Sequence, residues 1–67
     1  SATYRRLIRA LYEGNKTISS ISPKYDTAHV SQLMMAGVVD FAGDSFSELT
    51  LSEYGRQVYL HLNPVGK

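Results

Sequence analysis

The side chains best suited to chemistry gather in one short stretch, SPKYDTAHVSQ (residues 22–32). Ser31, His29 and Asp26 are residue types that can serve as nucleophile, base and orienting acid, in that order. Their positions along one helix point in different directions, however, and nothing around them suggests an oxyanion site. The chain also lacks a glycine-rich loop of the kind that cradles phosphate. We therefore expect a protein that is not an enzyme.

Metal and cofactor chemistry has as little support. The chain has no cysteine, so it can form neither a disulfide nor a cysteine-based zinc site. His29 and His61 are far apart in the sequence, and no carboxylate pattern surrounds them. We expect no metal site and no cofactor.

The length of 67 residues allows one domain at most, here residues 1–67. A domain this small buries only about 60% of the surface of its unfolded chain, which favours dimerisation or a larger parent chain. No apolar run approaches the roughly 20 residues that a membrane span needs. The amphipathic N-terminal segment carries arginines and is unlike a secretory signal. The sequence predicts a soluble cytoplasmic protein with no membrane partner.

The charges are distributed unevenly, although their sum is only +1. Residues 1–30 carry five basic side chains against two acidic ones, and residues 31–67 carry two basic against four acidic. This asymmetry fits a protein that shows one side to a polyanion. In so short a chain it fits chance equally well.

Two helices are expected in the first third of the chain. Apolar residues at helical spacing predict a helix over residues 3–13, with Gly14 and Asn15 as its stop. Its stripe consists of Tyr4, Leu7, Ile8, Leu11 and Tyr12. The next segment, KTISSIS (residues 16–22), predicts a short helix capped by Thr17. A short β-bridge is the alternative, since threonine and isoleucine favour strands.

A third helix is expected over about residues 23–36. It can start at Ser22-Pro23, with proline in the first turn, or after Asp26, which is a second good N-cap. Gly37 is its natural stop. The inward face consists of Val30, Leu33, Met34 and Gly37.

A β-hairpin and a last helix follow. VVDFA (residues 38–42) and FSELTL (residues 46–51) read as two strands joined by a turn over residues 43–45. Thr50 and Glu53 predict a capping box at the start of the helix, with Thr50 as N-cap, and Leu49 and Tyr54 a hydrophobic staple. Asn63-Pro64 ends this helix.

The inward stripe of the last helix consists of Leu51, Tyr54, Gly55, Val58, Tyr59 and Leu62. Gly55 on that stripe predicts close approach to another element, because glycine inside a helix otherwise costs about 1 kcal/mol. Leu60 falls off the stripe and is expected to be exposed.

The expected order of helices and hairpin, together with two segments of the sequence, resembles the winged helix-turn-helix superfamily of DNA-binding domains. HVSQLMMAGVVD (residues 29–40) resembles the end of a recognition helix followed by a strand, and LTLSEYGRQVYLHL (residues 49–62) resembles the junction between wing and last helix. The resemblance implies an α+β fold, mainly α: helix, short helix, recognition helix, two-stranded β-hairpin wing and C-terminal helix.

The sequence departs from that superfamily in two places. The region between Ile18 and Gly37 is shorter by about half a dozen residues, so the second or third helix must be truncated. The hairpin carries Asp44 and Glu48 where DNA-gripping wings carry lysine or arginine. We do not expect this hairpin to grip phosphate.

The resemblance implies a small transcriptional regulator that binds double-stranded DNA with its third helix in the major groove. Gln32 can pair with adenine, Thr27 and Ser31 can bond bases or phosphates, and Ala28 can touch a thymine methyl group. The expected reading residues are Lys24, Tyr25, Thr27, Ala28, His29, Ser31 and Gln32, with Lys16, Arg5, Arg6 and Arg9 on flanking phosphates. The simpler alternative is that all of them are solvated surface residues. Arg56 is expected to pair with an acidic neighbour or to cap the junction.

Two kinds of protein partner remain open. A homodimer would use the last helix, through Tyr59, Leu60 and Leu62, and the first helix. The alternative function is a winged-helix module for protein–protein interaction, as part of a larger chain. The near-neutral charge and the acidic hairpin favour that alternative, whereas the basic N-terminal half and the polar third helix favour DNA binding at the nucleoid.

Overall fold

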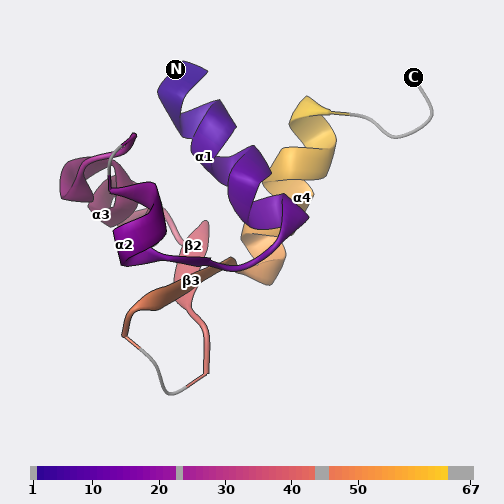
Figure 1. The fold of residues 1–67 in the computed structure, drawn as a ribbon. Helices are drawn as coiled ribbons and strands as arrows, with labels where there is room; N and C mark the ends of the chain where they lie inside the picture. The colour runs from indigo at the N-terminus through magenta and orange to yellow at the C-terminus, as the bar shows by residue number, and fades with distance from the viewer. Residues whose placement is uncertain (1, 23, 44–45, 64–67) are drawn as a thin grey trace.

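The computed structural model describes residues 2–22, 24–43 and 46–63, which form an α+β fold with four helices and a small sheet (Figure 1). The fold is mainly helical. In chain order the elements are α1 (Ala2–Glu13), β1 (Lys16–Thr17), α2 (Ile18–Ile21), α3 (Thr27–Met35), β2 (Val39–Phe41), β3 (Glu48–Leu51) and α4 (Glu53–Leu62).

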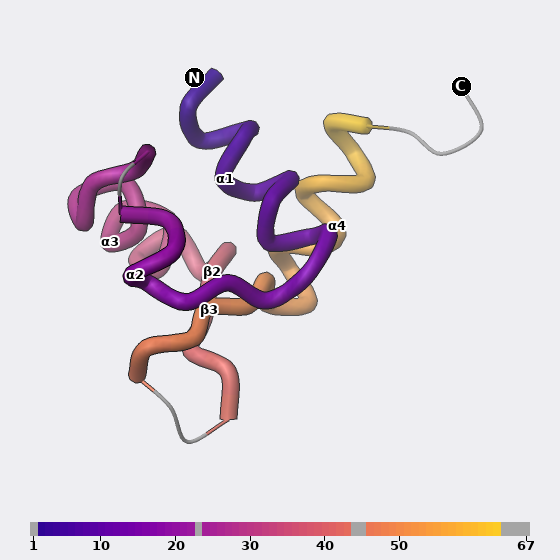
Figure 2. Tube along the Cα trace, viewed as in Figure 1, coloured from indigo at the N-terminus to yellow at the C-terminus, as the bar shows by residue number. Residues whose placement is uncertain are grey.

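Helix α1 lies between the other helices, with α2 and α3 on one side and α4 on the other (Figure 1). It contacts both α4 and β3. The tube in Figure 2 shows the start of α1 and the end of α4 at the same end of the molecule, with the β2–β3 hairpin at the opposite end. No helix among the described residues is long and apolar enough to cross a membrane.

The sheet is antiparallel, with strand order β1-β3-β2. In β2, Val39 lies opposite Leu51 and Phe41 opposite Leu49, so the expected hairpin is confirmed. On the other edge of β3, Lys16 pairs with Leu49. The KTISSIS segment forms both structures that the sequence left open, a two-residue strand and then a one-turn helix.

Thr17 joins these two structures. Its Oγ1 accepts a hydrogen bond from the backbone N–H of Ser20 at 3.3 Å, as an N-cap of α2. The next backbone N–H, of Ile18, donates to the carbonyl of Ser47 at 2.7 Å. The expected cap is confirmed, and α2 is only four residues long.

The core is built from residues of α1, α2, α3, β2 and β3 and from Val38, which precedes β2. Leu7 of α1 and Leu49 of β3 are fully buried, and each such side chain stabilises the fold by about 1.5–3 kcal/mol relative to an exposed one. The remaining buried apolar residues are Ile8, Leu11, Ile21, Leu33, Val38, Val39 and Leu51. The stripe predicted for α1 supplies its share of this core, with Tyr4 and Tyr12 packed at its edge.

Helix α3 begins later than residue 23. Asp26 is its N-cap, in an extended conformation, and Oδ1 of this residue accepts from the backbone N–H of His29 at 3.2 Å. Of the two expected starts, the second is therefore right. The N–H groups of Lys24 and Tyr25 both donate to the carbonyl of Ile21, so these two residues belong to the α2–α3 turn. Gly37 ends the helix with a φ of 78°, as predicted.

Helix α4 also begins later than predicted. Its N-cap is Ser52, whose Oγ accepts from the backbone N–H of Gly55 at 2.9 Å. Thr50 pairs with Asp40 inside the sheet and cannot cap the helix, so the predicted capping box is wrong. The predicted staple is wrong as well, because Leu49 is buried in β3 while Tyr54 is 60% exposed.

The stripe predicted for α4 is right only in part. Gly55 is buried, and Val58 and Tyr59 pack against the core, but Leu62 is 42% exposed and Leu51 belongs to β3. Leu60, which was expected to be exposed, is half-buried. Asn63 is the C-cap, and Pro64 lies outside the described residues.

Gly55 is the point of closest approach between α4 and the rest of the fold. A Cβ atom at this position would collide with the backbone carbonyl oxygen of Val38. Neither that carbonyl nor the helix can move away freely, because the same oxygen accepts the backbone N–H of Ser52 at 3.0 Å. The close approach predicted from the sequence is confirmed.

We predict that Gly55→Ala lowers the free energy of unfolding by about 1–3 kcal/mol, because the clash with Val38 outweighs the better helix propensity of alanine. Thermal unfolding followed by circular dichroism measures the change. Gly14→Ala is the matched control: its new methyl group meets nothing within 4 Å, so stability should stay the same or rise by about 0.4–1 kcal/mol. Equal stability of the two variants would contradict the close approach.

Candidate nucleic-acid interface

The outer face of α3 is a short exposed surface. Leu33 is buried, and His29, Val30 and Met34 are half-buried, which leaves five residues of the helix turned to solvent. We call the exposed part the α3 face; it consists of Thr27, Ala28, Ser31, Gln32 and Met35. Four of these five residues belong to the set predicted from the sequence.

The α3 face combines hydrogen-bonding groups with small apolar ones. The hydroxyls of Thr27 and Ser31 and the amide of Gln32 can both donate and accept. Sequence analysis missed Met35, which is 85% exposed. Its position off the inward stripe of α3 was a signal, because an apolar residue outside the stripe of a helix must face either solvent or a partner.

Tyr25 and His29 were also predicted to read bases, but the structure places them on the inner side of this region. Tyr25 is half-buried and packs against the core. The ring of His29 lies 5.2 Å from that of Tyr4, edge to face, and so ties α3 to α1. Sequence spacing within α3 could not reveal this contact, because it depends on where α1 lies.

Asp26 sets the charge at the start of α3. Its Oδ1 lies 2.9 Å from Nδ1 of His29, but no N–H is aligned between them, so the contact is a close approach rather than a hydrogen bond. The carboxylate is mostly exposed beside the helix N-terminus, where it offsets the attraction of the free N–H groups for phosphate. Lys24, exposed in the preceding turn, is the nearest basic residue along the chain.

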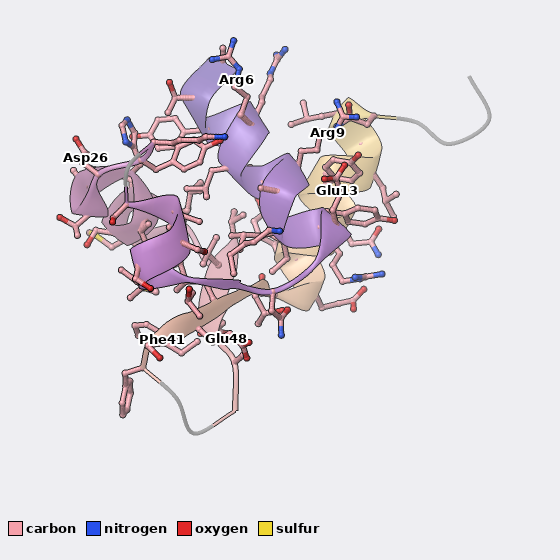
Figure 3. The ribbon with its side chains drawn as sticks, in the orientation of Figure 1. Arg6, Arg9, Glu13, Asp26, Phe41 and Glu48 are labelled. Carbon is pink, nitrogen blue, oxygen red and sulfur yellow. The ribbon has the colours of Figure 1, made fainter. Side chains whose placement is uncertain are left out.

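The predicted phosphate-binding residues lie elsewhere. Arg5, Arg6 and Arg9 line a hollow of about 160 Å³ on α1, together with Leu62 and Asn63 at the end of α4. None of the residues that line this hollow belongs to α3. Figure 3 shows Arg9 beside the end of α4 and Asp26 on the far side of α1. The structure therefore does not bring the arginines together with the α3 face.

Lys16, the last residue of the predicted set, lies in β1 and is half-buried. The eleven residues predicted to contact DNA thus fall into separate places. Four lie on the α3 face with Lys24 nearby, Tyr25 and His29 lie on its inner side, three arginines line the hollow on α1, and Lys16 lies in β1.

The hairpin presents an aromatic residue that sequence analysis counted only as part of a strand. Phe46 is 80% exposed, and its ring lies edge-on to that of Phe41 at 5.4 Å. Glu48 begins β3 and is half-buried (Figure 3). Asp44, the other acidic residue expected in the hairpin, lies outside the described residues. The signal for Phe46 was its position beside the turn, where a strand can no longer bury it.

The predicted dimer residues have different surroundings. Tyr59 stacks on Tyr12 at 4.1 Å between ring centroids, so this contact is made within the chain. The guanidinium of Arg56 lies over the Tyr12 ring, 5.2 Å from its centroid, and forms no ion pair with the described acidic residues. Among the described residues, the expected acidic partner of Arg56 is therefore not found. Of the three predicted dimer residues, Leu62 is the exposed one.

Comparisons with known proteins add no family to this description: no family model, no curated protein and no solved structure matches the chain. Within the described residues, no group of three side chains is placed to hold a metal ion. The site must be interpreted from its own geometry.

We predict that Asp26→Ala lowers the free energy of unfolding by about 1 kcal/mol, because the N-cap bond to His29 is lost. Asp26→Asn should change it by less than about 0.5 kcal/mol, since asparagine is an equally good N-cap. Urea unfolding of both variants measures the two changes. Equal losses would mean that the charge of Asp26, and not its cap, stabilises the start of α3.

Proposed function

We propose that this chain is a winged-helix DNA-binding module that acts as a transcriptional regulator, with the α3 face in the major groove. The order of the described elements supports the winged-helix assignment: a first helix, a short strand, a one-turn helix, a third helix, a hairpin and a last helix. The polar outer surface of α3 is the observation that carries the functional part of the proposal.

The dimensions of α3 suit a groove. Nine helical residues at 1.5 Å each span roughly 13 Å, and the major groove is about 12 Å wide. In this arrangement Gln32 pairs with an adenine edge, while Ala28 and Met35 lie against thymine methyl groups. Thr27 and Ser31 bond bases or backbone, and Lys24 contacts a phosphate from the turn.

Charge limits the affinity of this interface. The α3 face contains no lysine or arginine, and Lys24 has Asp26 two residues away. Phosphate neutralisation supplies most of the affinity of DNA-binding proteins. A single copy should therefore bind DNA weakly, and a second binding contact, through a dimer or a protein partner, would be needed for tight binding.

We predict that random-sequence duplex DNA shifts the amide resonances of residues 24–32 and Met35 at low salt. The logarithm of the affinity should fall against the logarithm of salt concentration with a slope of only about −1 to −2, because one or two phosphates are neutralised. Titration of ¹⁵N-labelled protein at several salt concentrations measures both. An unchanged spectrum at low salt would reject the proposal, as would shifts centred on residues 5–9.

The same titration with Asp26→Asn gives a sharper version of the test. Removal of this charge beside the backbone should raise the affinity about twofold or more at low salt, with the helix cap retained. Glu53→Gln is the matched control, because it removes one negative charge from the first turn of another helix, α4, and should leave the affinity unchanged. An equal gain in both variants would indicate only an effect of net charge.

A second candidate function, protein–protein interaction, is favoured by a different observation. Tyr54 and Leu62 are large apolar side chains that α4 leaves exposed, and the basic residues of α1 lie beside the end of the same helix. These features would be without use in a module that only binds DNA through α3.

A further inference from the structure

Helix α4 leaves part of its apolar surface exposed. Tyr54, Val58 and Leu62 follow one another at i, i+4 and i+8, so they lie in a row along the helix. Together with Gln57 and His61 they line a shallow hollow of about 460 Å³. Within the described part of the chain no other element lines this hollow. Tyr54 and Leu62 are therefore exposed at the two ends of this row, while Val58 between them is half-buried against the core.

This apolar row runs directly into the arginine hollow. Leu62 lines both hollows, so it joins the row on α4 to Arg5, Arg6 and Arg9 on α1. We call this continuous region the α1–α4 surface. It combines an apolar row at one end with three guanidinium groups at the other.

The arginines are placed against the electrostatic preference of their own helix. Arg5 ends the first turn of α1 and Arg6 comes directly after it; the helix dipole disfavours positive charge in this turn, which contains no acidic residue. Arg9 pairs with Glu13 at 3.3 Å, but this pair is exposed and weak. Among the described residues, Arg5 and Arg6 form no ion pair. The three positive charges around this hollow repel one another, and an anionic partner would offset that repulsion.

We infer that the α1–α4 surface binds a segment of an acidic partner protein. Apolar side chains of that segment lie on Tyr54, Val58 and Leu62, in the way that an amphipathic helix lies in a groove. Its carboxylates reach the hollow at Arg5, Arg6 and Arg9, whose planar guanidinium groups can each hold a carboxylate through two parallel hydrogen bonds. This inference concerns α1 and α4 and stands independently of DNA binding by α3.

Two other occupants fit the surface less well. Duplex DNA would satisfy the arginines, but its backbone offers nothing apolar for the row on α4. A second copy of this chain would bring the same apolar row but few carboxylates, since α4 has one acidic residue, Glu53, and carries Arg56 three residues later. An acidic amphipathic segment matches both halves of the surface.

A synthetic peptide tests the inference directly. The probe is a helix-forming peptide of about 15 residues with leucines at i, i+4 and i+8 and glutamates beyond the last leucine. Added to ¹⁵N-labelled full chain, it should shift amide resonances around residues 5–9 and 54–62 together, and added salt should weaken the binding. Two control peptides, one with lysines for glutamates and one with serines for leucines, should bind at least tenfold more weakly.

Paired charge-reversal variants separate this surface from the proposed DNA interface. Arg5→Glu should weaken binding of the peptide at least tenfold and leave binding of duplex DNA unchanged. Lys24→Glu makes the same charge change in the turn before α3. It should weaken binding of duplex DNA and leave binding of the peptide unchanged. Leu62→Asn should weaken binding of the peptide about fivefold or more. The native spectrum should be retained, because this side chain is already partly exposed.

Several results would overturn the inference. Absence of peptide-induced shifts would do so, as would equal binding of the lysine-containing peptide. Shifts at residues 54–62 that grow with protein concentration alone would assign the row to a second copy. Equal shifts at residues 5–9 with inorganic phosphate, and none at 54–62 with the peptide, would leave a simple anion site.

Discussion

The carbonyl of Val38 is the contact on which the rest of this fold depends. It accepts the backbone N–H of Ser52 at 3.0 Å, receives the Ser52 hydroxyl at 3.2 Å, and lies against the helix at Gly55. The same hydroxyl lies 2.5 Å from the carbonyl of Gly37. One short junction therefore holds the end of α3, the start of β2 and the first turn of α4. Since α1 packs on α4 and β3, the placement of α1 depends on this junction as well.

This junction also explains which parts of the fold the sequence could predict. The extent of α1, the stop of α3 at Gly37 and the close approach at Gly55 follow from local patterns. For the start of α3 the sequence offered both Ser22-Pro23 and Asp26 and did not decide between them. The sequence did not locate the start of α4, because Thr50 and Ser52 can both cap a helix in isolation. Only the pairing of Thr50 with Asp40, across the hairpin, decides between them.

The candidate site shows the same division. Helical periodicity identified most of the α3 face, since the inward residues of one helix define its outward ones. It could not show that Tyr4 would cover His29, or that the arginines of α1 would face the end of α4. These are contacts between helices, and they are fixed by packing. Exposed apolar residues such as Met35 and Phe46 were missed because a sequence pattern assigns apolar residues to the core by default.

Separation of charge from the polar α3 face is the physical basis of the functional account. One side of α1 meets α3 through Tyr4, and the other meets α4, where the arginines gather. DNA bound through the α3 face alone would leave those arginines unused, because the hollow that they line contains no residue of α3. Two surfaces with different chemistry therefore lie on opposite sides of one helix, which suits a module that connects DNA to another protein.

The absence of cysteine from the chain makes a direct test of this separation simple. Ser31→Cys places a single thiol on the α3 face, and Asn63→Cys places one beside the arginine hollow without removing an arginine. Each variant is labelled with the same short photoreactive reagent, mixed with duplex DNA at low salt and irradiated. We predict that DNA is cross-linked from position 31 and not from position 63. Cross-linking from position 63 alone would contradict the account, because it would place the DNA on the arginines.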